Sequence, residues 1–350
     1  MPMIHFCTYF DSLYLVRGLA LHRSLLKHLE QFTLHVLCLD DFTHHTLESL
    51  QLAHVTLVRL ADLEARYPRL SAARQDRTPI ELYFTCTPAL ISYVLSAAPA
   101  NDFVSYVDAD LYFYSSPAAL FEELSDSSVL LVPHCPSPQI AYLDNWGIYN
   151  VGFLAFRNDP AAAKCVSWWR ERCFEWCYDR LEGGRYADQK YLDQLPRLFK
   201  GVRATRTKGA LFAPWNVSSF QLGERDGRPS VDGEPLIFYH FSHVAMIGKH
   251  VFDHGLSFYR ARLTAPVKKL LYVPYIQVLL DLIRETGVQK NFYGIPREYP
   301  KFWDRLHREV YRGRLYVFGP CAVEVDLGFL GSVYRMARSA LGLSPRQAAG

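Results

Sequence analysis

An apolar run that ends in two aspartates constrains this chain more than any other segment. Residues 103–107 predict a buried central strand, and Asp108 and Asp110 follow it directly. Because one residue separates the two carboxylates, an extended backbone directs both to the same face. Two buried like charges raise each other's pKa and lose solvation, a penalty that a divalent cation removes. The segment therefore predicts a Mg2+ or Mn2+ site, and the alternative is an aspartate-rich turn at a strand end.

The N-terminal part of the chain alternates between strand and helix patterns. Apolar runs predict strands at 4–8, 32–39 and 55–60, and apolar residues at helical spacing predict a helix at 14–29. Such βαβ order favours a parallel or mostly parallel sheet with helices on both faces. Ligands of these folds bind at the carboxyl ends of the strands.

A further helix is predicted between the third strand and the aspartate pair. Thr87 suits its N-cap and Pro88 its first turn, and the helix continues through residues 91–95. Arg74 and Arg77 lie in the polar stretch before it. There they either neutralise a phosphate or are merely solvated.

The composition is that of a globular protein with a large core. The chain has 350 residues, of which 50% are hydrophobic and 21% charged, and its net charge is +3. A charge this small, without a dominant basic stripe, argues against a nucleic-acid partner. Eight cysteines are scattered through a chain too large to need disulfides, so free thiols and a cytoplasmic location are expected. The sequence shows no secretory signal and no run of about 20 apolar residues.

The pattern becomes mainly helical towards the C-terminus. This change predicts a boundary between a catalytic domain at residues 1–260 and a mainly helical region at 261–350. Before the boundary, a turn-rich segment at 223–235 predicts a hairpin. The basic residues of the C-terminal region either rest on an anionic membrane surface or face water on helices that pack on their own domain. These residues are Lys268, Lys269, Arg335, Arg338 and Arg346.

Four segments resemble, in their order, the motifs of nucleotide-sugar glycosyltransferases of the GT-A fold. They are D-A-D at 108–110, N-x-G at 150–156, D-Q at 187–192 and Y-H-F-S-H at 239–243. The resemblance is to glycosyltransferase family 8 and its relatives in particular, and with the first strand and helix it spans about residues 3–250. It implies a GT-A fold, which is a Rossmann-like mixed, mostly parallel sheet flanked by helices, here with a helical C-terminal appendage.

The resemblance implies a metal site for Mn2+ or Mg2+. Asp110 would bind the ion directly, Asp108 would meet the ribose or bridge to the ion through water, and Ala109 would contact the nucleotide sugar. His240 is the implied third ligand, because neutral imidazole binds Mn2+ beside carboxylates. The family has a glycine after H-F-S where this chain has His243, so His243 is the alternative ligand.

The same resemblance implies contacts with the nucleotide. The turn at the end of the first strand would hold the base and ribose through Thr8, Tyr9 and Asp11, with Tyr9 stacked on the base. Arg77 and Lys249 would pair with phosphate. The K-P-W of the family is missing after the histidine segment, so Lys249 is equally compatible with an exposed lysine. The alternative for the turn residues is ordinary turn chemistry.

Two further segments are implied to meet the donor sugar. Asn150 and Gly152 would approach it, with the glycine allowing close approach of the backbone. Asp188 and Gln189 would act on its reactive face as the catalytic residues. The alternative for Asp188 is a cap at the head of a helix at 189–195.

These motifs together imply transfer of a sugar from a nucleotide diphosphate sugar, with a UDP-sugar favoured and with retention of configuration. The acceptor would be a hydroxyl of a glycan, a lipid-linked molecule or a protein, and the enzyme would be cytoplasmic, at the inner face of the membrane if its basic C-terminal region contacts lipid. One alternative is a sugar-nucleotide nucleotidyltransferase, which needs a glycine-rich loop that residues 8–13 lack. The other is a non-catalytic module that binds a nucleotide sugar.

Overall fold

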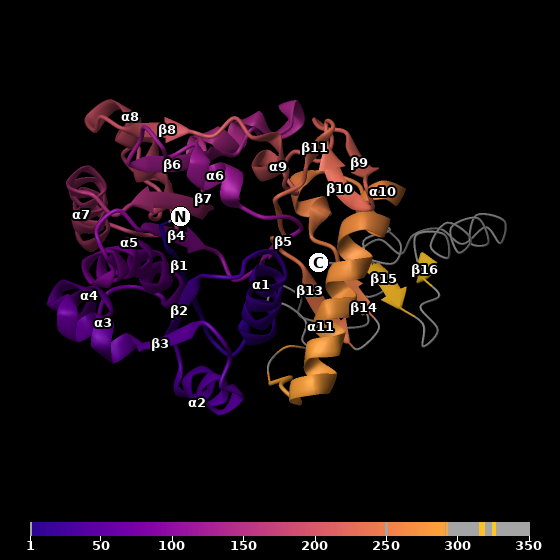
Figure 1. The fold of residues 1–350 in the computed structure, drawn as a ribbon, viewed down its shortest axis with the longest axis horizontal. Coiled ribbons are helices and arrows are strands. Elements are labelled where there is room, and N and C mark those ends of the chain that lie inside the picture. The colour runs from indigo at the N-terminus through magenta and orange to yellow at the C-terminus, as the bar shows by residue number, and fades with distance from the viewer. Residues whose placement is uncertain (1, 249–250, 291, 293–314, 319–323, 327–350) are drawn as a thin grey trace, which may run out of the picture.

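A seven-stranded sheet with the order β3-β2-β1-β4-β7-β6-β8 forms the centre of the molecule in the computed structural model (Figure 1). The structure describes residues 2–248, 251–290, 292, 315–318 and 324–326. All neighbouring strands of this sheet are parallel except where β7 pairs with β4 and β6. The predicted mixed, mostly parallel α/β fold is therefore confirmed. The strands are β1 (Ile4–Phe10), β2 (Thr33–Cys38), β3 (Val55–Arg59), β4 (Phe103–Val107), β6 (Val129–Pro133), β7 (Tyr149–Arg157) and β8 (Val202–Ala204).

Helices cover both faces of the sheet, because the side chains of each buried strand alternate between the faces. In β1, Phe6 belongs to the core that includes α1 (Leu15–His28), whereas Cys7 belongs to the core shared with α5 (Pro79–Ala97) and α7 (Pro160–Glu175). The shorter helices of this region are α2 (Asp41–Leu50), α3 (Leu60–Arg66), α4 (Pro68–Ala73), α6 (Ala118–Glu122), α8 (Leu195–Leu198) and α9 (Lys208–Leu211).

Helix α5 begins well before the predicted helix. Thr78 and Glu81 form a capping box in which the Thr78 N–H donates to Glu81 Oε2 at 2.9 Å, and Pro79 occupies the first turn. The prediction that Thr87 caps the helix and that Pro88 starts it is therefore wrong. Pro88 lies inside the helix, where its missing N–H removes one hydrogen bond without ending the helix.

Within the described part of the chain, α5 is the one helix whose length and apolar composition suffice to cross a membrane. It packs against β1, β4 and α7, and 56% of the apolar window is buried inside the protein. A core helix meets the same criterion, so this feature alone says little about a membrane.

Short antiparallel sheets lie beside the central one. Strand β5 (Leu111–Phe113) pairs with β12 (Phe238–His240). The turn-rich segment predicted as a hairpin forms β9 (Leu222–Arg225) and β10 (Arg228–Val231), which confirms the hairpin, and β11 (Glu234–Pro235) adds a third strand. The last sheet consists of β13 (Ala245–Gly248), β14 (Val251–Asp253), β15 (Leu315–Phe318) and β16 (Glu324–Asp326). Of these strands, β15 and β16 lie in the region expected to be mainly helical.

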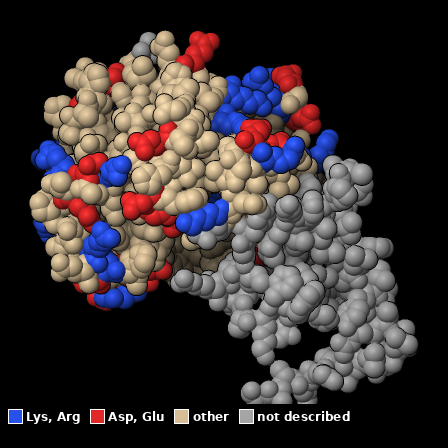
Figure 2. All heavy atoms as spheres, turned by 90° about the horizontal axis from the view of Figure 1, so that it is seen from below, with Lys and Arg blue, Asp and Glu red and all other residues tan. Residues whose placement is uncertain are grey.

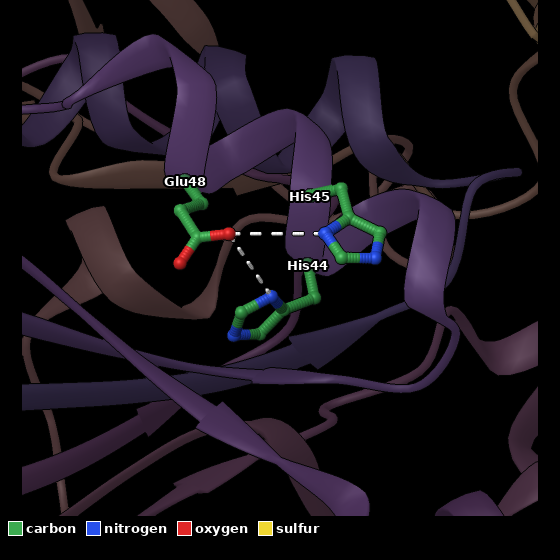
Figure 3. Close-up of side chains that lie close together, drawn as sticks. All are labelled: His44, His45 and Glu48. Atoms are coloured by element: carbon green, nitrogen blue, oxygen red, sulfur yellow. Dashed lines mark ion pairs between the residues drawn. The ribbon is translucent and has the colours of Figure 1, made fainter.

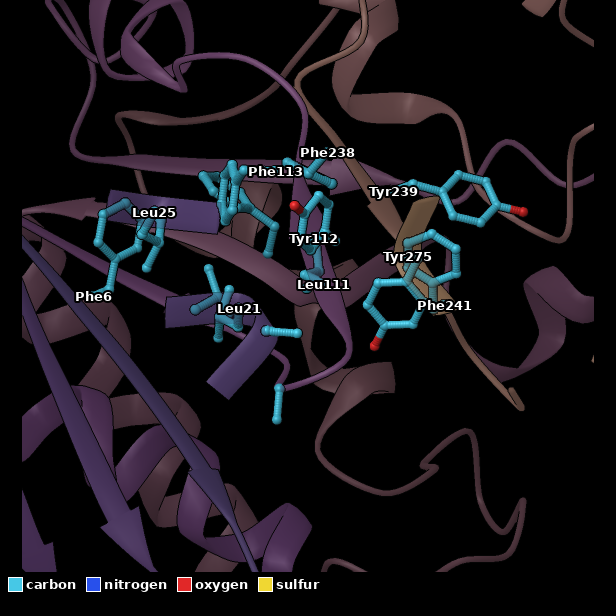
Figure 4. Packing of buried hydrophobic residues seen from close by; sticks show 14 of the residues in the cluster. Phe6, Leu21, Leu25, Leu111, Tyr112, Phe113, Phe238, Tyr239, Phe241 and Tyr275 are labelled. Atoms are coloured by element: carbon cyan, nitrogen blue, oxygen red, sulfur yellow. The ribbon is translucent and has the colours of Figure 1, made fainter. Parts of the chain in front are cut away.

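Helix α11 (Val273–Thr286) packs into the same hydrophobic core as β1, α1 and β5. The rings of Tyr275 and Phe241 are stacked with centroids 3.7 Å apart, and Tyr112 lies beside them (Figure 4). The predicted C-terminal helix is therefore present, while the boundary at residue 260 stays a prediction. Two short helices precede α11, namely α10 (Ala265–Val267) and η4 (Lys268–Tyr272).

Basic and acidic side chains are intermixed on the face shown in Figure 2. Lys269 is exposed, and its Nζ lies 4.0 Å from Glu224 Oε2. Arg335, Arg338 and Arg346 lie outside the described residues. The membrane contact of the basic C-terminal region therefore stays a prediction.

Candidate active site

Strand pairing brings His240 to the aspartate pair. Strand β12 runs antiparallel to β5 with His240 opposite Leu111, and the Phe241 N–H donates to the Asp110 carbonyl at 2.9 Å. His240 Nε2 lies 3.0 Å from Asp110 Oδ1 and 3.6 Å from Asp108 Oδ2. One possible ligand atom from each of the three residues lies within 4.8 Å of the other two. The three predicted ligands therefore converge.

His243, the alternative ligand, lies in a different environment. Its ring is stacked on Phe258 with centroids 4.1 Å apart, and its backbone has a positive φ of 63°. It does not belong to the group formed by His240 and the two aspartates. The fold therefore favours His240 as the third ligand.

Gly152 in β7 allows these side chains to lie directly against the strand. A Cβ at this position would lie 2.7 Å from His240 Cε1 and 3.0 Å from Asp108 Oδ2, so any other residue would require these side chains to shift. The Gly152 carbonyl accepts the Asp108 N–H at 2.9 Å, and its own N–H donates to Asn150 Oδ1 at 2.8 Å. Gly152 is absent from the lining of the cavity described below. The close approach seen in the structure is to the ligand side chains, and the approach of Gly152 to the donor sugar stays a prediction.

Burial and charge together set the protonation of this group. Burial raises the pKa of Asp108, and the charge of Asp110 raises it further. Burial alone would also raise the pKa of Asp110, but His240 outweighs it and the pKa of Asp110 is lowered. Burial would lower the pKa of His240, yet the two aspartates raise it. Two carboxylates and an imidazole that attract positive charge in this way fit Mn2+ or Mg2+, whose binding requires neutral His240.

A cavity of about 890 Å³ extends from this group along the carboxyl edge of the sheet. Residues that follow β1 and β2 line one end, the aspartate pair after β4 lies in the middle, and the end of β6 and the start of antiparallel β7 form the other end. Open α/β sheets bind ligands at this edge, and the volume suits a small-molecule site. The predicted site residues in the lining are Tyr9, Asp11, Asp108, Ala109, Asp110, Asn150, Asp188, Gln189 and His240.

Two described residues predicted to bind the nucleotide, Thr8 and Arg77, are not in this lining. Thr8 is fully buried, and because neighbouring strand residues alternate, it points to the opposite face of β1 from Tyr9. The Arg77 guanidinium donates to Thr85 Oγ1 at 2.6 Å and to a backbone carbonyl of α7 at 3.0 Å. Arg77 thus ties α5 to α7, and its predicted phosphate contact is corrected to a structural one. Lys249 lies outside the described residues.

Asp188 is a buried carboxylate at the cavity wall. Its side chain makes no capping hydrogen bond to the short helix η2 (Gln189–Gln194) that follows it, which disfavours the capping interpretation. Its Oδ2 has no hydrogen-bond partner among the described residues. Burial raises the pKa of Asp188 to about 7, with a smaller contribution from the charge of Asp108. A hydrogen bond from the Thr87 side chain lowers the pKa of Asp188 but does not offset burial, and a buried carboxyl whose pKa stays raised in a cavity wall is typical of a functional position.

The aromatic residues at the β6–β7 end of the cavity carry no motif that predicts a role for them. They lie in short elements without a motif, among them η1 (Pro138–Trp146) and η3 (Leu256–Tyr259). Aromatic residues make up 14% of the chain, so composition alone does not single them out. These lining residues are Tyr142, Trp146, Trp215, Phe258 and Tyr259.

A second histidine–carboxylate group lies on α2 and consists of His44, His45 and Glu48 (Figure 3). Glu48 Oε2 lies 3.9 Å from His44 Nδ1 and 3.7 Å from His45 Nδ1. The side chains of His45 and Glu48 are 69% and 57% exposed. His44 is buried, but both of the pairs end on the exposed Glu48, and ion pairs at an exposed carboxylate contribute little, so we assign the group no function.

Comparison with known proteins relates the chain to two bacterial proteins, although no family model matches it. It is 34% identical over 288 residues to the uncharacterized protein YfnD of Bacillus subtilis (strain 168), which covers 81% of this chain and 91% of YfnD. The chain belongs to the family of YfnD. The uncharacterized protein YfnF of the same strain is 36% identical to it over 245 residues, or 68% of this chain and 80% of YfnF.

Several solved structures are also similar to the chain. The galactosyltransferase LgtC in complex with donor and acceptor sugar analogs is 14% identical with a TM-score of 0.48, over 84% of this chain and 98% of LgtC. Mouse xyloside xylosyltransferase 1 is 13% identical with a TM-score of 0.44, over 69% of this chain and 98% of the xylosyltransferase. The glycosyltransferase GlyE of Streptococcus pneumoniae TIGR4 is 14% identical with a TM-score of 0.45, over 89% of this chain and 72% of GlyE. Likenesses this low say nothing about activity, which has to be inferred from the site.

Proposed function

We propose that this protein is a metal-dependent glycosyltransferase that uses a nucleotide diphosphate sugar, with a UDP-sugar as the preferred donor, and retains the configuration of the sugar. The observation that carries this proposal is the convergence of Asp108, Asp110 and His240 at the middle of a cavity large enough for such a donor. The order of the four motifs, which resembles that of family 8 and its relatives, supports the same chemistry.

The ion would be held by Asp108, Asp110 and His240. When bound, Mn2+ or Mg2+ supplies a Lewis acid that stabilises the charge developing on the departing nucleoside diphosphate. The protein fixes the ligands in advance, since the Tyr106 hydroxyl donates to Asp108 Oδ1 at 2.8 Å. The described residues of the cavity lining include no Lys or Arg. This supports a dependence on metal, because no Lys or Arg of the described lining faces a diphosphate there.

The nucleoside would occupy the end of the cavity at β1 and β2. Asp11 is fixed there by the Leu13 N–H, which donates to its Oδ1 at 2.9 Å, and by the Tyr83 hydroxyl at 3.4 Å. Tyr9 lines the same end, and its hydroxyl lies 3.2 Å from Thr87 Oγ1. A fixed carboxylate beside an aromatic ring suits ribose hydroxyls and a base.

Asp188 and Gln189 would act on the sugar, from the part of the lining near β7. The ionised carboxylate of Asp188 would stabilise the positive charge that develops at the anomeric carbon. Gln189 is oriented by a hydrogen bond from its Nε2 to the Trp146 carbonyl at 3.2 Å. The assignment of retention rests on the likeness of this D-Q element to that of retaining enzymes.

A thermal-shift panel of UDP-, GDP- and TDP-sugars, with Mn2+ or with EDTA, tests the proposal. A ligand that binds only the folded state at 100 times its Kd adds about 2.7 kcal/mol of stability. We expect a UDP-sugar to raise the melting temperature only with Mn2+ and to be hydrolysed slowly. Equal stabilisation in EDTA, or none by any nucleotide sugar, would contradict the proposal. Stabilisation without hydrolysis or transfer would indicate a binding module.

A further inference from the structure

We propose that the acceptor is an uncharged saccharide whose apolar ring faces stack on Tyr142 and Phe258 at the mouth of the cavity. This inference rests on the proposed function and names the acceptor class of the same site. It follows from three features of the described residues, which are the direction of the cavity, the exposed aromatic rings at one end of it, and the charge of its lining.

The strand order gives the cavity a donor end and an acceptor end. The aspartate pair follows β4, which lies between β1 on one side and β7 on the other. If the nucleoside occupies the end at β1 and β2, the transferred sugar lies beyond the aspartates, towards β7 and β6. An acceptor hydroxyl has to approach the sugar from that side, where η1 and η3 supply the wall.

Two aromatic residues of this wall are exposed beyond what packing explains. The exposed fraction is 46% for Tyr142 and 64% for Phe258. Each belongs to a larger aromatic group, since the Tyr142 ring lies 6.0 Å from that of Trp146 and the Phe258 ring lies 5.2 Å from that of Tyr259. Large apolar side chains that remain exposed in a concave site usually mark a binding surface.

The rings are held in place before any ligand arrives. Phe258 is stacked on His243, and the neighbouring Tyr259 hydroxyl lies 2.9 Å from Ser242 Oγ. The Arg260 guanidinium lies 5.7 Å from the centre of the Tyr142 ring, which links η3 to η1. Fixed rings lose little conformational entropy when a ligand binds.

The chemistry of the wall favours a neutral saccharide. Aromatic faces carry negative potential, and the C–H groups on one face of a pyranose ring are slightly positive, so the two surfaces pack well. The described lining contains the carboxylates Asp11, Asp108, Asp110 and Asp188 and neither Lys nor Arg. Because the metal would neutralise Asp108 and Asp110, Asp188 is the carboxylate that would repel an acidic or phosphorylated acceptor beside the transferred sugar. The described lining offers such an acceptor no cation, since Arg260 contacts Tyr142 but is not among the lining residues.

A glycan array probed with the full-length protein, UDP and Mn2+ tests this inference. We expect binding to uncharged glycans and little binding to sialylated, sulfated or phosphorylated ones. Tyr142→Ala and Phe258→Leu should each lower the signal at least tenfold, because both remove an aromatic plane. Phe258→Leu keeps an apolar side chain, so its effect separates loss of the ring from loss of hydrophobic surface. Phe258→Tyr, which keeps the plane, should retain binding. Leu198→Ala, which alters a 45% exposed leucine outside the cavity lining, is the matched control.

The outcomes separate this inference from the proposed function. UDP binding with Mn2+ is measured first on the unaltered protein, and its absence contradicts the proposed function and removes the basis of the inference. If UDP binds but the glycans recognised are anionic, or none is recognised, the acceptor assignment is overturned and the donor assignment is kept. Neutral glycan binding that survives both Tyr142→Ala and Phe258→Leu also overturns it, and melting temperatures show that the variants are folded.

Discussion

At the residue scale, Gly152 is a position of the site where even the Cβ of an alanine would crowd the proposed metal ligands. In Gly152→Ala the new Cβ would lie 2.7 Å from His240 Cε1, so the imidazole has to move away from the aspartates. We expect UDP–Mn2+ binding to weaken at least tenfold, or about 1.4 kcal/mol. Gly223→Ala is the control, since its Cβ would meet only Ser230 Oγ at 3.6 Å. Calorimetry on both variants checks this, and equal affinities would show that the glycine is not needed for the ligand geometry.

Asp188 and Gln189 are expected to serve turnover and not nucleotide binding. Asp188→Asn and Gln189→Ala should each lower the rate of donor hydrolysis more than tenfold, about 1.4 kcal/mol in the barrier, with little change in UDP affinity. Rates and affinities measured on the same samples decide this. A loss of activity that follows a loss of stability would return Asp188 to the role of a helix cap.

The pH dependence of stability gives an independent test of Asp188. Its pKa is raised to about 7 in the folded protein, so the folded state binds the proton more tightly than the unfolded state does. The free energy of unfolding of the wild type therefore falls as the pH rises from about 4 to 7, where Asp188 is protonated in the folded state but ionised in the unfolded state. Asp188→Asn removes that loss. In metal-free buffer we expect the melting temperature of the variant relative to wild type to increase from pH 5 to pH 8. A constant difference, or one that falls with pH, would show that the carboxylate is well satisfied in the folded state.

At the element scale, α5 depends on its first turn. Thr78→Ala removes the hydroxyl of the capping box and should lower the free energy of unfolding by about 1 kcal/mol. Ser96→Ala alters an exposed serine near the other end of the same helix and should have a smaller effect. Denaturant titrations compare the two. An equal or larger loss for Ser96→Ala would contradict the assignment of the helix start.

The same helix shows where sequence reasoning reaches its limit. The strand that precedes Asp108 could be predicted because its signal is local, whereas Pro88 suggested a helix start that the capping box at Thr78 overrides. The convergence of His240 with the aspartates depends on the pairing of β5 with β12, which lie far apart in the chain. Spacing alone could not reveal it, and the resemblance to family motifs supplied it. Arg77 was misplaced for the same reason, since its partner on α7 is set by packing.

At the scale of the whole molecule, α11 and the sheet domain share one core. Tyr275→Ala should lower the free energy of unfolding by about 3 kcal/mol, because the ring is fully buried against Phe241. Tyr275→Phe should be neutral or stabilising, since the buried hydroxyl has no hydrogen-bond partner among the described residues. Denaturation of both variants checks this. A small loss for Tyr275→Ala would indicate that the region after residue 260 folds separately.

The proposed glycosyl transfer depends on a metal held by Asp108, Asp110 and His240. The most direct test is calorimetric titration of UDP into the full-length protein with Mn2+ and with EDTA, repeated for Asp110→Ala, His240→Ala and His243→Ala. We expect binding only with Mn2+, loss of binding in Asp110→Ala, and a larger effect of His240→Ala than of His243→Ala. Undiminished binding of UDP and Mn2+ by folded Asp110→Ala would contradict the metal site and with it the proposed chemistry.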